Sequence, residues 1–80
     1  MSNFINQLDQ ELTMAHSTII AINESLLTLD TAMQTAARGP ETALKPVRET
    51  TTYAINLIQS LYPLIMSMKT SLQILRQAGY

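Results

Sequence analysis

Apolar residues recur along the first half of the chain in strictly alternating steps of three and four residues. This spacing is a heptad pattern, which places one apolar seam along a helix and favours packing against a second helix at a shallow angle. It predicts a helix over about residues 3–38. The seam positions are Ile5, Leu8, Leu12, Ala15, Ile19, Ile22, Leu26, Leu29, Met33 and Ala36.

The second half of the chain carries a seam with the same spacing, in which only Thr51 is polar. It predicts a second helix that starts at about residue 41 or 46 and ends at about residue 78, so that the two helices match in length. The positions are Leu44, Val47, Thr51, Ala54, Ile58, Leu61, Ile65, Met68, Leu72 and Leu75.

A glycine and two prolines mark the connection between the two patterns, at about residues 39–45. Gly39 enters a left-handed conformation at little cost and predicts the C-cap of the first helix. Pro40 either opens the second helix, which Pro46 then kinks, or Pro46 opens the regular part after one loose turn. Pro63 falls in mid-helix at the outermost heptad position, where a bend need not disturb the seam.

The chain therefore predicts a single all-α domain over residues 1–80, an antiparallel two-helix hairpin of coiled-coil type. Folding back around Glu41 pairs seam residues whose numbers add up to 83 or 84, such as Ile22 with Leu61. The same register places Asp9 beside Arg76.

The second helix has more apolar surface than the first can cover. Ile55, Leu57, Tyr62 and Leu64 flank its seam, and the predicted register sets polar side chains opposite them. A helix that is apolar on most of its circumference is normally buried on more than one side. We therefore expect oligomerisation to complete the hairpin into a helical bundle. The expected interface residues are Ile20, Leu27, Ile55, Leu57, Tyr62 and Leu64.

The composition supports this expectation. Charged residues make up 14% of the chain, against about 25% in an average soluble domain. Thr, Ser, Gln and Asn replace them, which is typical of a surface partly covered by neighbouring protein. The net charge of -1 gives no electrostatic reason to expect nucleic-acid binding.

No arrangement of residues predicts catalysis. The chain has no cysteine and one histidine, His16, which we expect to be a solvated residue beside the seam. Asp9 and Glu11 are too close in sequence to share a helix face, and Gly39-Pro40 lacks the glycines and Lys-Ser/Thr of a phosphate loop. We expect no enzyme activity, metal, cofactor or small-molecule substrate.

The sequence leaves the cellular location open. No basic stretch precedes the first apolar residues, so we expect no cleavable signal peptide. The most apolar stretch, residues 57–68, is interrupted by polar residues, and we expect no transmembrane helix. Both the cytoplasm and export by a leaderless route fit these features.

The leading hypothesis is a structural or assembly subunit that associates with its own copies into a bundle, ring or filament, as a virion component does. In length, hairpin layout and proline-bearing turn, the chain resembles the needle subunits of type III secretion systems. Their usual Pro-x-x-Pro turn is replaced by Pro40 and Pro46 with five residues between them, so no functional residues are carried over. The alternative is a small adaptor or co-chaperone that holds a helix of another protein between Leu57, Leu64, Ile20 and Leu27.

Overall fold

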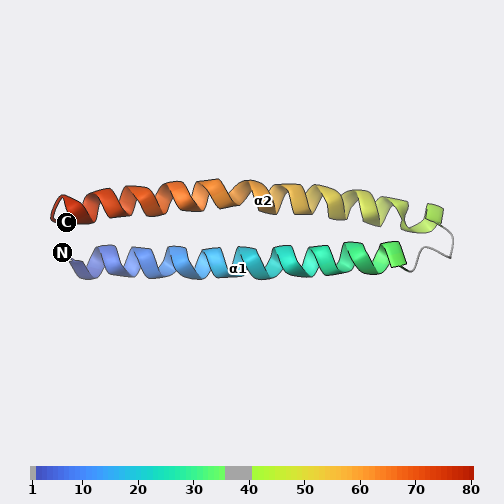
Figure 1. Cartoon of the computed structure of the whole chain (residues 1–80), viewed down its shortest axis with the longest axis horizontal. Helices are drawn as coiled ribbons and strands as arrows, with labels where there is room; N and C mark the ends of the chain where they lie inside the picture. The colour runs from blue at the N-terminus through green and yellow to red at the C-terminus, as the bar shows by residue number, and fades with distance from the viewer. Residues whose placement is uncertain (1, 36–40) are drawn as a thin grey trace.

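The computed structural model describes residues 2–35 and 41–80, apart from the side chains of residues 2, 41 and 42. Two helices, α1 (Ser2–Thr35) and α2 (Glu41–Gln77), lie side by side and antiparallel, and form a rod of 60 × 15 × 13 Å (Figure 1). The start of α1 and the end of α2 lie at the same end of the rod. The predicted all-α helical hairpin is confirmed.

The helix bounds decide between the two starts expected for the second helix. It begins at Glu41, the earlier of the two, and contains Pro46, so residues 41–45 of the expected connection are helical and Pro46 does not open the helix. A proline inside a helix removes one backbone hydrogen bond, and the turns on either side of it can still form. The predicted C-cap at Gly39 lies outside the described residues.

α2 ends in a glycine cap that the sequence analysis did not identify. Gly79 has a φ of +91°. Its N–H donates to the carbonyl of Arg76, and the N–H of Tyr80 donates to the carbonyl of Leu75, both at 3.1 Å. These two bonds form a Schellman motif, which satisfies carbonyls left free at a helix end.

Three side-chain hydrogen bonds between the two helices show their register. In each pair the residue numbers add up to 82, within two of the sums predicted for the seam. The bonds run from Arg76 Nη2 to Asn6 Oδ1 (2.9 Å), from Lys69 Nζ to Thr13 Oγ1 (3.1 Å) and from Gln59 Nε2 to Asn23 Oδ1 (3.5 Å). Arg76 thus bonds to Asn6, one turn before the expected neighbour Asp9.

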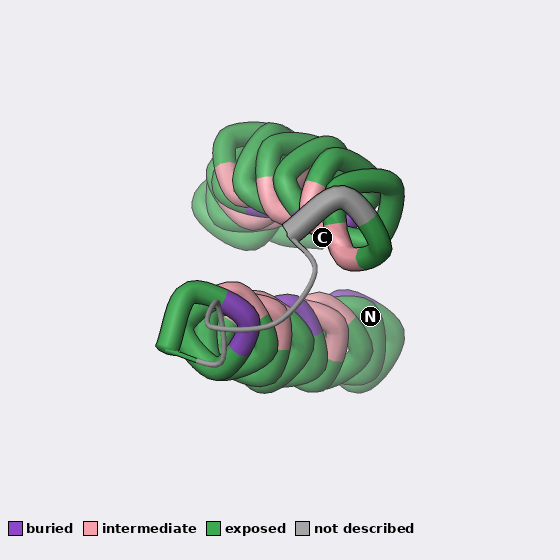
Figure 2. Tube along the Cα trace, turned by 90° about the vertical axis from the view of Figure 1, so that its right-hand side faces the viewer, coloured by how far each residue is buried: buried purple, intermediate pink, exposed green. Residues whose placement is uncertain are grey.

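The core of the hairpin is a single line of side chains between the helices, which we call the contact line. Its members recur every seven residues and are buried or half-buried, on the sides of the helices that face each other (Figure 2). They are Ile5, Leu12, Ile19, Leu26 and Met33 of α1 and Leu44, Thr51, Ile58, Ile65 and Leu72 of α2.

The other half of each predicted seam is largely exposed, which corrects the expectation that both halves form the core. A step of three residues turns the side chain by about 60° away from the line along which two helices touch. Such positions lie beside the contact, and only further helices can cover them. The exposed seam residues are Leu8, Ile22, Leu29, Val47, Met68 and Leu75.

Candidate interaction surface

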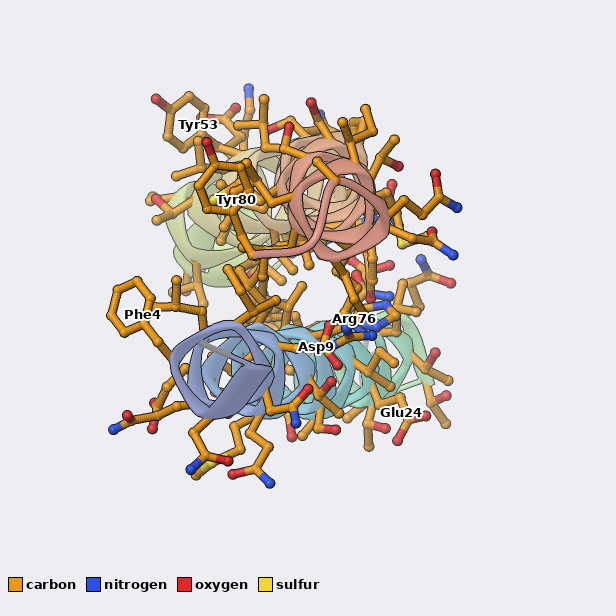
Figure 3. The ribbon with its side chains drawn as sticks, turned by 90° about the vertical axis from the view of Figure 1, so that its left-hand side faces the viewer. Phe4, Asp9, Glu24, Tyr53, Arg76 and Tyr80 are labelled. Atoms are coloured by element: carbon orange, nitrogen blue, oxygen red, sulfur yellow. The ribbon has the colours of Figure 1, made fainter. Side chains whose placement is uncertain are left out.

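The flat hairpin has two unlike faces, one on each side of the contact line. Seen from the end that holds the termini, Phe4 and Tyr80 lie on one side, and Asp9 and Arg76 on the other (Figure 3). We call these sides the apolar face and the polar face.

The apolar face consists of a central groove and two ridges. Its groove is lined by the second half of the seam, namely Leu8, Ala15, Ile22 and Leu29 of α1 and Val47, Ala54, Leu61, Met68 and Leu75 of α2. By helical spacing, the next row outward on each helix forms a ridge. The ridges are Phe4, Glu11, Thr18, Ser25 and Ala32 on α1, and Ala43, Thr50, Leu57, Leu64 and Ser71 on α2.

Three hollows lie along this groove, at its two ends and between them. Each is lined by apolar side chains of both helices. The one near the termini lies between Phe4, Ile5, Leu75 and Tyr80. The next, of about 430 Å³, is lined by Leu8, Glu11, Leu12, Ser67, Met68, Ser71 and Leu72. The third, of about 410 Å³, is lined by Leu26, Pro46, Val47, Thr50, Thr51 and Ala54.

Three hydroxyl groups on the ridges are already hydrogen-bonded within their own helices. Thr18 donates to the carbonyl of Met14 at 2.9 Å, Thr50 to that of Pro46 at 3.0 Å, and Ser71 to that of Ser67 at 3.1 Å. Burying a polar group is costly when it loses its hydrogen bond. These three residues keep theirs, so another protein can cover them at little cost.

Charge is concentrated away from the apolar face. Among the described side chains, Glu11 is the only charged residue on it. The described cations lie on the polar-face side of α2, at Lys45, Arg48, Lys69 and Arg76. The buried centres of protein interfaces contain few charged residues. The apolar face has one described charge along a rod of 60 Å and is suited to such burial.

The polar face is closed by contacts between the helices. The three hydrogen bonds between the helices lie here, and the rings of His16 and Tyr62 meet edge to face, with centroids 5.8 Å apart and planes at 83°. At the end away from the termini, Asp30, Gln34, Lys45, Arg48, Glu49 and Thr52 line a polar hollow of about 460 Å³. His16 is half-buried, which corrects the expectation that it is solvated.

The structure divides the predicted interface residues between the two faces. Leu57 and Leu64 lie on the apolar face and are 53% and 58% exposed. By helical spacing, Ile20, Leu27, Ile55 and Tyr62 belong to the polar-face side. We expected α1 to leave Ile55 and Tyr62 uncovered, but both are half-buried. For Tyr62 the reason is that His16 of α1 packs against its ring.

Sequence reasoning missed the groove itself. Its residues were identified as seam positions and assigned to the core of the hairpin. The heptad pattern carries no signal that separates the two rows, because two helices in a coiled coil can bury both rows of a seam.

Within residues 2–35 and 41–80, no three His, Cys, Asp or Glu side chains gather closely enough to hold a metal ion. Neither described helix contains an apolar stretch long enough to cross a membrane. Comparison of the chain with protein-family models, curated proteins and solved structures gave no match.

Proposed function

We propose that this protein is a non-enzymatic structural or assembly subunit that associates with copies of itself through its apolar face. The observation that carries the proposal is the exposed second half of both seams. It provides an apolar groove along a hairpin that cannot cover the groove itself, and Glu11 is the one charged residue beside it among the described side chains.

The heptad pattern supports this role. In four-helix bundles, both apolar positions of each heptad point into a shared core, whereas in this hairpin only the contact line is enclosed. A second pair of helices on the apolar face would enclose the remaining row. The low charge and the internally bonded ridge hydroxyls are consistent with such a covered surface.

The adaptor hypothesis loses its specific basis. Its groove required Leu57 and Leu64 to lie beside Ile20 and Leu27, and these pairs lie on opposite faces. A partner helix cannot contact all four residues at once.

The test is the mass of the purified chain in solution, measured by analytical ultracentrifugation over a range of concentrations. We expect a mass above that of the 8.9 kDa chain, which falls on dilution. The double variant Leu57→Asp with Leu64→Asp should shift the equilibrium to single chains, because association would bury unpaired carboxylates.

A matched control changes two apolar residues with the same spacing on the opposite face. Ile20→Asp with Leu27→Asp should leave the mass unchanged, with helicity of both variants followed by circular dichroism. If the control variant dissociates while the Leu57 and Leu64 variant keeps its mass, the polar face is the interface and the proposal is wrong. A single chain at every concentration would also overturn it.

A further inference from the structure

The apolar face has the spacing needed to pair with itself in one orientation. We infer that two copies join by their apolar faces into an antiparallel four-helix bundle, with a two-fold axis that crosses the rod at Ile22 and Leu61. This inference rests on the proposed function and specifies the partner and its orientation.

The area that needs covering fits one further copy. The chain exposes 5990 Å², whereas a globular monomer of its mass exposes about 4,800 Å². The excess of about 1,200 Å² exceeds the roughly 800 Å² that each partner buries in a standard interface. Association of two apolar faces through a standard interface would therefore remove about two thirds of this excess.

The ridge of α2 is self-complementary about its middle. Leu57 and Leu64 stand on either side of Leu61, four residues before it and three after it. A two-fold axis at Leu61 places Leu57 against Leu64 of the partner subunit, and Leu64 against Leu57 of the partner subunit. The two most exposed leucines of the chain then cover each other.

The groove repeats this relationship with small and large residues. On α1, Ala15 and Leu29 lie seven residues on either side of Ile22, and on α2, Ala54 and Met68 lie seven residues on either side of Leu61. The same axis sets each alanine opposite a large side chain of the other copy. Alternation of small and large residues is how facing helices fill a core at native density.

The parallel orientation lacks the leucine pairing. If the axis ran along the rod, α2 would face α1 of the partner, and in the observed register Leu57 and Leu64 would meet the row of Ser25 and Thr18. Leucine gains more from burial against leucine than against the polar ridge of α1. The antiparallel orientation is therefore favoured.

Spin labels can measure this orientation, because the chain contains no native cysteine that would compete for the label. Gln10→Cys and Glu24→Cys each add one labelling site on the exposed back of α1. In the antiparallel bundle the two Gln10 labels lie about 36 Å apart along the rod and the two Glu24 labels about 6 Å, at 1.5 Å per residue. The distance between labels, from double electron–electron resonance, should be about 15 Å or more longer for Gln10 than for Glu24.

Each outcome decides a different point. Doubled mass with the long Gln10 distance supports the antiparallel pair. Doubled mass with similar distances at both sites indicates parallel copies, which overturns this inference and leaves self-association intact. A larger assembly overturns the closed pair alone, whereas a single chain at all concentrations overturns the proposed function as well. Adding Leu57→Asp and Leu64→Asp to the labelled variants should abolish both distances.

Discussion

Ile19 and Ile22 lie one helical turn apart on α1, yet Ile19 is 8% exposed and Ile22 is 41% exposed. Ile19 belongs to the contact line and packs between the helices, whereas Ile22 lies in the groove of the apolar face. The same residue type therefore occupies two environments, because three residues of helix turn the side chain out of the hairpin. The contact line holds the two helices together, and the groove is left uncovered.

This difference predicts unequal effects of two identical substitutions. In dilute solution, where single chains predominate, Ile19→Ala should lower the free energy of unfolding by about 2–3 kcal/mol, since it removes a buried side chain from the contact line. Ile22→Ala should lower it by less than about 1 kcal/mol, since the groove is open. Urea denaturation followed by circular dichroism measures both values.

At higher concentration Ile22→Ala should have the larger effect on self-association, although it has the smaller effect on the free energy of unfolding. Ile22→Ala should weaken self-association several-fold in sedimentation equilibrium under conditions in which both variants remain helical, since it removes apolar surface from the groove. Equal losses of stability in the dilute samples would show that Ile22 is part of the hairpin core and that the contact line is misassigned.

Gly79 provides a second prediction. Its φ of +91° strains any side chain, although no atom lies within 4 Å of an added Cβ. Gly79→Ala should therefore destabilise the end of α2 by about 1–2 kcal/mol through the backbone alone. Hydrogen exchange at the amide of Ala78, which donates to the carbonyl of Ile74, reports the loss.

Gly79→Asn is the graded control, since asparagine adopts the left-handed conformation more readily than alanine. Its exchange rate should lie between those of the wild type and Gly79→Ala. Identical rates in all three proteins would mean that the cap does not hold the last turn of α2.

The contact between the rings of His16 and Tyr62 on the polar face should contribute to the stability of the hairpin. A double-mutant cycle with His16→Ala and Tyr62→Ala should give a coupling free energy of about 0.5–1.5 kcal/mol, as expected for edge-to-face rings. The control cycle pairs His16→Ala with Tyr53→Ala, because the exposed Tyr53 lies on another part of α2. Its effects should be additive within about 0.5 kcal/mol. Equal coupling in both cycles would exclude a specific ring contact.

The heptad seams were sufficient to predict two antiparallel helices and, to within two residues, their register. Both follow from matching one apolar row of each helix to the other. The pattern did not separate Ile19 from Ile22, because a heptad seam reads the same in a two-helix hairpin and in a larger bundle. Which row faces inward depends on the rotation of each helix, and this rotation is set by tertiary packing.

The positions of the expected interface residues were harder to predict. Leu57 and Leu64 exceed what one seam can cover, and the structure leaves both exposed. Tyr62 was expected on the same surface as these leucines, but its ring packs against His16 on the polar face. Predicting this contact requires the rotation of each helix about its axis, which the spacing of apolar residues does not give. The Gly79 cap was missed, although a glycine directly after the expected helix end at residue 78 is the usual signal for such a cap.

Thr51 is the polar exception on the contact line, and its hydroxyl bonds to the backbone of its own helix. The residue is 5% exposed, and its Oγ1 donates to the carbonyl of Val47 at 2.8 Å. That carbonyl remains available to the backbone N–H of Thr51, so removing the hydroxyl leaves no unsatisfied group. Thr51→Val should raise the free energy of unfolding by about 1 kcal/mol, since a methyl group replaces a hydroxyl in the packed line.

Thr70→Val is the matched control, because Thr70 makes the same bond, to Met66 at 3.0 Å, on an exposed surface. It should change stability by less than about 0.5 kcal/mol. Thermal denaturation of the three proteins at one concentration measures both effects, and a destabilised Thr51→Val would show that the hydroxyl has a packing or bonding role in the contact line.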